Sequence, residues 1–576
     1  MLLIGSFLAL GGRCFYLQYL KADHYADVCV KQQRLFKRLQ PQRGAILDCR
    51  GRVLAASNEI QIVKAEPRII DEPKEVSSQL APILDMGAHD ICKLIVDRKD
   101  TGYVRLKEDA DANQCDQVLG RGRGPDSTKR KRVHPGIGVE SDWRRYYPMG
   151  RLVSNVVGFT DPYNRGLEGI ERQYDERLSG SPGRSIFFAD VGRRPISLKQ
   201  QSEVLADGVG MILTLDATIQ QFVRDELIKQ YESYEAEAAV AIVAVPKTGA
   251  ILAMVSLPDF DPAHVRTTDP NDFRSRAITD WYEPGSIIKP IVAAIALDAG
   301  AVNKTEKIFC ENGNYHGKGF GRIGEYRRGF GDLTVCEILI DSSNIGMAKI
   351  GQRLGKDRLY EGLKLFGFGK KVGIELPGEV DGLLWPPEKW TGYSVTRIPF
   401  GQEICVTAMQ LLRAFCILAN GGRLVRPYLV KAIVDNNGKV TELKRPLPPV
   451  GYIIKPEVAE WIVTEAMAGV VNEGTGKRAQ LEKWQVFGKT GTANIARSNT
   501  RGYSDSEYVA SFVAGAPAED PAIVVLVSIR KPNRALGKGY TGGVVASPVA
   551  AKIVAKTLNY LGVRPTKNVS PEYVRR

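Results

Sequence analysis

The sequence predicts an α+β fold, a sheet flanked by helices, preceded by a membrane anchor and an elongated N-terminal domain. The 576 residues exceed one ordinary domain of roughly 100–200 residues. Strand-like runs occur at 238–257 and again at 484–530, with a largely helical stretch between them. Strands at both ends of a helical segment predict a sheet that joins those ends.

The composition excludes several classes of protein. Hydrophobic residues make up 44% and charged residues 25%, which is typical of soluble globular domains and argues against disorder, collagen and polytopic membrane proteins. The net charge of +14 is compatible with nucleic acid, an anionic membrane surface or acidic substrates, and does not choose among them.

The spacing of the histidines and cysteines limits which metal sites and catalytic sites the chain can form. None of the nine cysteines is in C-x-x-C spacing, so we expect no zinc ribbon or redox motif, and mostly buried thiols. None of the five histidines has H-E-x-x-H spacing, and no G-x-S-x-G is present. Nucleophilic chemistry is therefore expected to use a base other than histidine.

The N-terminal run is interpreted as a single membrane anchor over residues 1–20. Residues 2–12 are uncharged, but as a helix they span only about 16 Å, against about 30 Å for a bilayer core. We therefore expect Arg13 to snorkel, the apolar run to continue through Leu20, and the first turns to be missing. A signal peptide and a buried helix are the alternatives.

The elongated N-terminal domain is expected over residues 21–205. Its first part, 21–39, has the pattern of an amphipathic helix, and 41–57 predicts strand, turn and strand, with the turn at Arg50-Gly51. The basic run at 121–132 lacks interleaved aromatic residues, so we interpret it as a solvated loop and expect no nucleic-acid partner.

The second domain is expected over 206–565, followed by a tail at 566–576. Asp216 has the position of an N-cap before an apolar helical pattern. The β-branched runs on either side of Pro246–Gly249 predict a hairpin, and 547–561 predicts a terminal helix.

The first chemical motif is S-x-x-K at Ser286 and Lys289. On a helix, residues three apart share one face, so the lysine can reach the serine. A serine hydroxyl needs an adjacent base, and a lysine can serve if burial or a second cation leaves its amine neutral. The same spacing recurs at Ser528 and Lys531, where a strand directs the two side chains to opposite faces.

Two further motifs follow. Ser342 and Asn344 present a hydroxyl and an amide before a helix with a predicted apolar stripe at Met347, Ile350 and Leu354, although a plain N-cap is the alternative.

Residues 489–492 would give a strand edge one cation, backbone N–H groups and alternate hydroxyls, which suits an extended peptide ending in a carboxylate. The second Lys-Thr-Gly, at 247–249, is interpreted as the hairpin turn.

In this order, the three motifs resemble the signature of the penicillin-recognising serine acyltransferases. The chain resembles a class B penicillin-binding protein, a bitopic peptidoglycan transpeptidase, over nearly its whole length. RGAILDCRGRVLA, GLEGIERQYDERLSG, TLDATIQ, ANGGRLVRPYLV and GYTGGVVASPV follow in the family's order. Cys49 and Arg50 depart from the family's usual Arg-Asn, and Ile287-Ile288 from its usual pair after the nucleophile.

The resemblance implies a site and a mechanism. Ser286 would be the nucleophile, Lys289 its base, and Ser342 a proton relay to the leaving group; no metal or organic cofactor is needed. The backbone N–H groups of Ser286 and Thr492 would hold the oxyanion. The substrate-binding residues would be Asn344, Lys489, Thr490, Gly491 and Thr492.

The resemblance also implies partners and a location. Expected are peptidoglycan stem peptides, β-lactams, a SEDS-type glycan polymerase and divisome proteins, with the catalytic domain on the extracytoplasmic side of the bacterial inner membrane. A septal role is favoured over an elongation role. The alternatives are a D,D-carboxypeptidase or β-lactamase, against which the large N-terminal region argues, and a non-catalytic β-lactam-binding scaffold.

Overall fold

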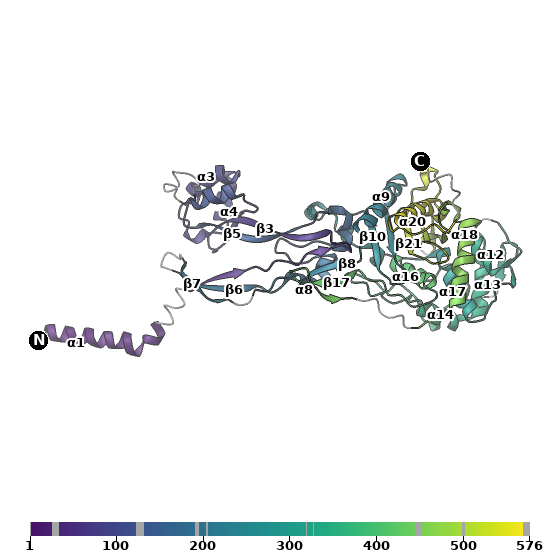
Figure 1. Cartoon of the computed structure of the whole chain (residues 1–576), viewed down its shortest axis with the longest axis horizontal. Coiled ribbons are helices and arrows are strands. Elements are labelled where there is room, and N and C mark those ends of the chain that lie inside the picture. Colours follow the sequence, from purple (N-terminus) through teal and green to yellow (C-terminus); the bar gives the residue numbers. More distant parts are fainter. Residues whose placement is uncertain are drawn as a thin grey trace. The chain divides into compact units, whose positions relative to one another are not determined.

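The chain forms two units that alternate along the sequence (Figure 1). The computed structural model describes residues 2–25, 34–121, 132–189, 195–202, 205–317, 319–326, 328–444, 451–497 and 502–567. The N-terminal unit contains Met1–Gly44, Ala56–Tyr146 and Glu176–Val209, and the C-terminal unit contains Ala45–Ala55, Tyr147–Asp175 and Gly210–Arg576.

The N-terminal unit begins with helix α1 (Leu2–Phe15) and a π-helical turn, Tyr16–Leu20. These elements coincide with the predicted anchor. In the portions of the chain that the structure describes, no helix combines the length and apolar character needed to cross a bilayer.

A three-stranded sheet follows, formed by β1 (Arg34–Leu39), β6 (Gly183–Ala189) and β7 (Pro195–Ser202). The prediction of a helix through residue 39 is wrong for β1. Each β1 residue has a partner on β6, from Arg34 with Phe188 to Leu39 with Gly183, so pairing with a distant strand overrides the local helical pattern. Residues 26–33 and most of the basic run (122–131) lie outside the described residues.

The remaining elements of this unit surround strand β3 (Val53–Ala65). From Ala56 onward β3 pairs with β5 (Ile137–Tyr146), and its end also pairs with β4 (Val104–Lys107). Three helices contribute to the adjoining core: α3 (Pro73–Leu84), α4 (Ala88–Val96) and α5 (Ala112–Leu119).

In the C-terminal unit, strands from three distant parts of the sequence lie side by side (Figure 1). The strands are β2 (Ile46–Leu47), the start of β3, β8 (Gly210–Leu213), β17 (Val430–Val434) and β18 (Val440–Leu443). The antiparallel pairing of β2 with β3 confirms the predicted strand, turn and strand.

The central sheet of this unit has five antiparallel strands in the order β10-β9-β21-β20-β19. Their bounds are Ala238–Ala244 (β9), Ile251–Leu257 (β10), Phe487–Ala496 (β19), Tyr503–Ala516 (β20) and Ile523–Arg530 (β21). The order confirms that one sheet joins both ends of the domain, and it places β19 at an edge. The residues 247–249 form the β9–β10 turn, as predicted.

Helices cover this sheet. α9 (Ala217–Ser233) and the terminal α20 (Ser547–Tyr560) bury apolar side chains in one core with the sheet, which includes Ile219, Ile553 and Phe512. α16 (Ala408–Ala419) packs against β9 and β21. The predicted N-cap is confirmed, because the Asp216 carboxylate accepts the Thr218 N–H.

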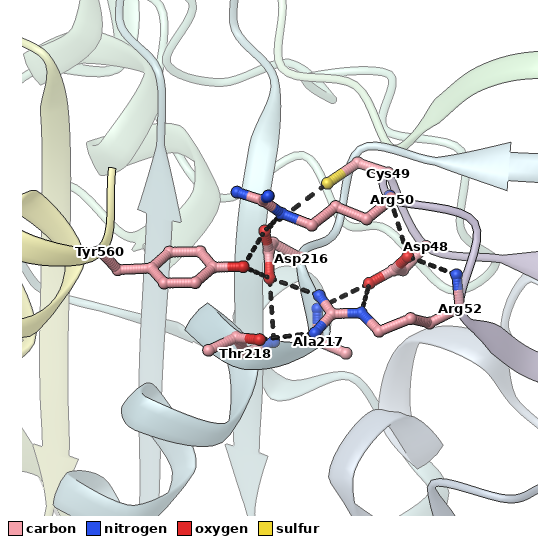
Figure 2. Close-up of polar contacts among 8 residues, drawn as sticks. All are labelled: Asp48, Cys49, Arg50, Arg52, Asp216, Ala217, Thr218 and Tyr560. Carbon is pink, nitrogen blue, oxygen red and sulfur yellow. Dashed lines mark hydrogen bonds and ion pairs between the residues drawn. The ribbon is translucent and has the colours of Figure 1, made fainter. Parts of the chain in front are cut away.

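A cluster of charged residues connects the β2–β3 turn to α9 and α20 through hydrogen bonds and ion pairs (Figure 2). The Asp216 carboxylate accepts hydrogen bonds from Arg50 Nε (2.7 Å), Arg52 Nη2 (2.6 Å) and the Tyr560 hydroxyl (3.1 Å). Asp48 accepts the backbone N–H groups of Arg50 and Arg52 within the turn. One buried carboxylate therefore joins segments from near both ends of the sequence.

Cys49 and Arg50, which depart from the family pattern, both lie at this cluster (Figure 2). Arg50 supplies a guanidinium to Asp216 and stacks on the Tyr560 ring, 4.8 Å from its centre. Burial, with the nearby carboxylates of Asp216 and Asp48, raises the pKa of the Cys49 thiol to about 11. Arg50 thus carries a charged contact while Cys49 stays a neutral thiol.

Candidate active site

Ser286 lies in a tight turn at the start of a buried helix. The turn, Gly285–Ile288, is a 3-10 helix and leads into α11 (Lys289–Asp298). Gly285 has φ +58°, and a Cβ there would lie 3.0 Å from the Thr492 carbonyl oxygen, so this position requires glycine. Ile287 and Ile288 are fully buried, which anchors the turn and leaves Ser286 at its surface.

Lys289 is fully buried directly after this turn. Its Nζ donates to the Ser342 carbonyl oxygen at 2.6 Å and to Asn344 Oδ1 at 2.8 Å, and lies 3.3 Å from Ser342 Oγ. Burial lowers the pKa of Lys289 to about 7, with the Glu325 carboxylate acting in the opposite direction. A substantial fraction of this amine is therefore neutral near pH 7.

Ser342 and Asn344 come together with Lys289 at the start of helix α13 (Asn344–Leu354). The N-cap of α13 is Ser343, whose Oγ accepts the Gly346 N–H at 2.9 Å, so the plain-cap alternative for Ser342 is wrong. Ser342 has φ +61°, a strained conformation for a residue other than glycine. The predicted apolar stripe of α13 is confirmed by the burial of its three members.

Lys489, on the edge strand β19, reaches the same hydroxyl from the other side. It is fully buried, and its Nζ donates to Ser342 Oγ at 2.9 Å and to the Thr490 carbonyl oxygen at 3.2 Å. Burial and the charge of Lys289 both lower the pKa of Lys489. Ser342 Oγ therefore lies between two buried amines.

The rest of the β19 motif is fixed by its neighbours. Thr490 Oγ1 lies 2.7 Å from Thr475 Oγ1, and Thr492 Oγ1 accepts the Gly542 N–H at 3.1 Å. A Cβ on Gly491 would lie 3.1 Å from the Pro284 carbonyl oxygen, so glycine lets β19 approach the nucleophile turn closely.

A cavity of about 800 Å³ opens over these groups. It is lined by five of the eight predicted site residues: Ser286, Ser342, Asn344, Thr490 and Thr492. The two lysines are buried beside it, and Gly491 lies between the two lining threonines of β19. The structure thus brings the three motifs together around one cavity.

Two residues at the site were not predicted from the sequence. Glu325 contacts the start of α13, and Thr475 holds Thr490. Neither belongs to a recognisable spacing pattern. Each lies 15 or 19 residues from its partner in the sequence and reaches it only through the path that the chain takes in the fold.

The repeated motifs prove to be structural. Ser528 accepts a hydrogen bond from Ser511 inside the sheet at 3.1 Å, and Lys531 pairs with Glu237. Lys247, in the β9–β10 turn, pairs with Asp520 at the surface.

Comparison with known proteins agrees with this geometry. The model of the penicillin-binding protein transpeptidase domain matches residues 239–555, and that of the penicillin-binding protein dimerisation domain matches 38–208. The chain belongs to the penicillin-binding protein transpeptidase family. The expected family and the α+β fold are thereby confirmed, and every predicted site residue of this penicillin-binding protein lies inside the first match.

Its relatives are similar over almost their whole length. Stage V sporulation protein D of Bacillus subtilis is 33% identical over 569 residues, covering 98% of this chain and 85% of that protein. The probable peptidoglycan D,D-transpeptidase PenA of Neisseria meningitidis is 30% identical over 574 residues, covering 99% and 93%. A crystal structure of a peptidoglycan synthetase from Bifidobacterium adolescentis shares the fold, with a TM-score of 0.73 at 24% identity, covering 93% and 98%.

Proposed function

We propose that this penicillin-binding protein is a peptidoglycan D,D-transpeptidase that cross-links stem peptides through an acyl-enzyme on Ser286. One observation carries the proposal: the buried Lys289 amine, with a pKa of about 7, lies one turn after Ser286 beside Ser342 and a substrate-sized cavity. The relative PenA, a probable peptidoglycan D,D-transpeptidase that matches along nearly its full length, supports the same activity.

Acylation begins when Ser286 Oγ attacks the carbonyl carbon of the penultimate D-Ala and Lys289 Nζ takes the hydroxyl proton. A neutral amine has two N–H groups, which Lys289 directs at the Ser342 carbonyl and Asn344 Oδ1. Its lone pair is then left to accept the serine proton.

The tetrahedral intermediate carries an oxyanion. We assign its stabilisation to the backbone N–H groups of Ser286 and Thr492, and the close approach of the nucleophile turn to β19 supports this assignment. When the C–N bond breaks, the departing D-Ala nitrogen takes a proton from Ser342 Oγ. Lys489, 2.9 Å from that oxygen, stabilises the transient negative charge.

Cross-linking reverses these roles. An amine of a neighbouring stem peptide attacks the acyl carbon and loses a proton to the lysine–serine pair, and Ser286 leaves with its proton restored. The Thr490 and Thr492 hydroxyls and the Lys489 amine bind the terminal carboxylate of the donor, Gly491 lets the strand approach, and Asn344 orients the peptide. A β-lactam would acylate Ser286 by the same first step and remain attached.

The cellular setting belongs to the same proposal. A septal role, anchoring through residues 1–20, an extracytoplasmic catalytic unit, and SEDS-type and divisome partners are supported by the resemblance of the sequence. The expected domains, 21–205 and 206–565, are consistent with family matches at 38–208 and 239–555.

The test is covalent labelling with a fluorescent penicillin, followed by mass spectrometry of the intact protein and peptide mapping. Ser286→Ala is expected to abolish the adduct without loss of folding. Ser528→Ala, at the other S-x-x-K, is the matched control and is expected to keep it. An adduct on Ser286→Ala would contradict the proposal, and rapid loss of the adduct would favour a β-lactamase.

A further inference from the structure

A carboxylate with no role in the mechanism above lies at the start of α13. Glu325 follows β14 (Gly321–Gly324). Its Oε2 accepts the Asn344 N–H at 2.7 Å, and its Oε1 accepts the Ile345 N–H at 3.1 Å and the Ser343 hydroxyl at 2.5 Å. Glu325 therefore accepts hydrogen bonds from the first N–H groups of α13, which have no partner within the helix.

The same segment also fixes the Asn344 side chain. Asn344 Nδ2 donates to the Gly324 carbonyl oxygen at 3.1 Å, which turns Oδ1 toward Lys289 Nζ at 2.8 Å. Both the backbone and the amide orientation of Asn344 therefore depend on Gly324 and Glu325. A flipped amide would present a donor to the lysine and remove one of its acceptors.

Glu325 also acts on Lys289 through its charge. The charged groups that act on Lys289 are Glu325, before α13, and Lys489, on β19. The cavity wall also carries acidic and basic side chains: Glu283, Asp341, Glu473, Arg328, Lys477 and Arg478. Glu325 is the carboxylate that favours the ammonium form of Lys289, against the effect of burial. A protonated Lys289 forms in every acylation, so this charge stabilises a state that the reaction must pass through.

We infer that Glu325 is a positioning residue for acylation, which orients Asn344 against Lys289 and balances the positive charge that Lys289 acquires. This inference rests on the proposed function. It adds no covalent step, because Glu325 neither gives nor takes a proton.

The test is the pH dependence of the second-order rate of acylation by a fluorescent penicillin, measured on the full chain. Glu325→Gln keeps the size of the side chain and one acceptor oxygen, but it removes the charge and replaces the second acceptor by an NH2 donor. In this variant the acid-side midpoint should move down by about half a pH unit or more. Its high-pH plateau should stay within about tenfold of wild type. Glu325→Ala should lose about 100-fold on the plateau, because Asn344 loses its anchor.

Two comparisons complete the design. Glu311→Gln removes a carboxylate that pairs with Lys349 on α13, and its midpoint is expected to match wild type. Glu325→Asp keeps the charge and should keep the midpoint, with a lower plateau.

An unshifted or raised midpoint in Glu325→Gln would overturn the inference. If that variant does not fold, an Asp variant with a wild-type plateau would overturn it. A wild-type chain that forms no adduct at any pH would overturn the proposed function as well.

Discussion

The Ser342 hydroxyl lies 2.9 Å from one buried amine and 3.3 Å from another, in a strained backbone conformation. Two ammonium groups this close would repel each other, so at least one must be neutral. The fold enforces this by burying both lysines completely. The base is therefore prepared by the protein before substrate arrives.

This arrangement sets the pH dependence. The pKa of Lys289, about 7, is lowered by burial, so its neutral form is lost as pH falls. The second-order rate of penicillin acylation is expected to fall about tenfold per pH unit below that value and to level off above it. A flat profile from pH 5.5 to 8.5 would show that another group is the base.

Replacement of the base should lower that rate far more than any change of pH within this range. Lys289→Ala is expected to lose about 10²–10⁴-fold at pH 8, where wild type is on its plateau. Circular dichroism would check that the variant is folded. A rate within tenfold of wild type would remove Lys289 from its role.

At the scale of elements, the sequence predicted those helices and turns that short-range patterns determine. Alternating β-branched runs gave the β9–β10 hairpin, and Asp216 marked the start of α9. The prediction of a helix at residues 34–39 was wrong because these residues pair with a strand more than 140 residues away in the sequence, at 183–188. Glu325 was missed although it is only 19 residues from Asn344, because no local pattern shows that the chain folds it back onto the start of α13.

The strand order also separates the two Lys-Thr-Gly motifs. The copy at 489–491 lies on the edge strand β19. The copy at 247–249 forms the turn between β9 and β10, at the opposite end of the strand order. Lys247→Ala is therefore expected to leave penicillin acylation within a few fold of wild type, while Lys489→Ala should reduce it strongly. A larger loss in Lys247→Ala than in Lys489→Ala would mean that the assignment is reversed.

At the scale of the molecule, the chain passes from one unit to the other five times, after residues 44, 55, 146, 175 and 209. The sequence pattern suggested that the two large domains, 21–205 and 206–565, meet at one boundary, with an anchor before them and a tail after them. No local signal marks 45–55 and 147–175 as parts of the C-terminal unit, since their membership depends on contacts with residues that come much later.

The charged cluster at Asp216 is one such contact between residues that lie far apart in the sequence. Burial opposes ionisation, but hydrogen bonds from Arg50 and Arg52 lower the pKa of Asp216 below its usual value. The ionised carboxylate therefore stabilises the fold above the pKa of the unfolded chain, about 4, and this stabilisation is lost as pH falls through the folded-state pKa.

Asp216→Asn should accordingly lower the melting temperature at pH 7, at a cost of about 1–3 kcal/mol. The difference from wild type should be constant between about pH 8 and 5 and narrow below about pH 4. Asp225→Asn is the control, because among the described residues that carboxylate accepts a hydrogen bond only from the Gln221 side chain, on the same helix. A gap that does not depend on pH would contradict this account.

The sheet order has a consequence for biosynthesis. β21, residues 523–530, lies between β9 and β20, so the β19–β20 hairpin has no place beside β9 until β21 has left the ribosome. Ser286 is made more than 200 residues earlier than the end of β21. A nascent chain therefore cannot assemble its reactive centre until it has been synthesised through residue 530, and an antibiotic cannot capture it before that point.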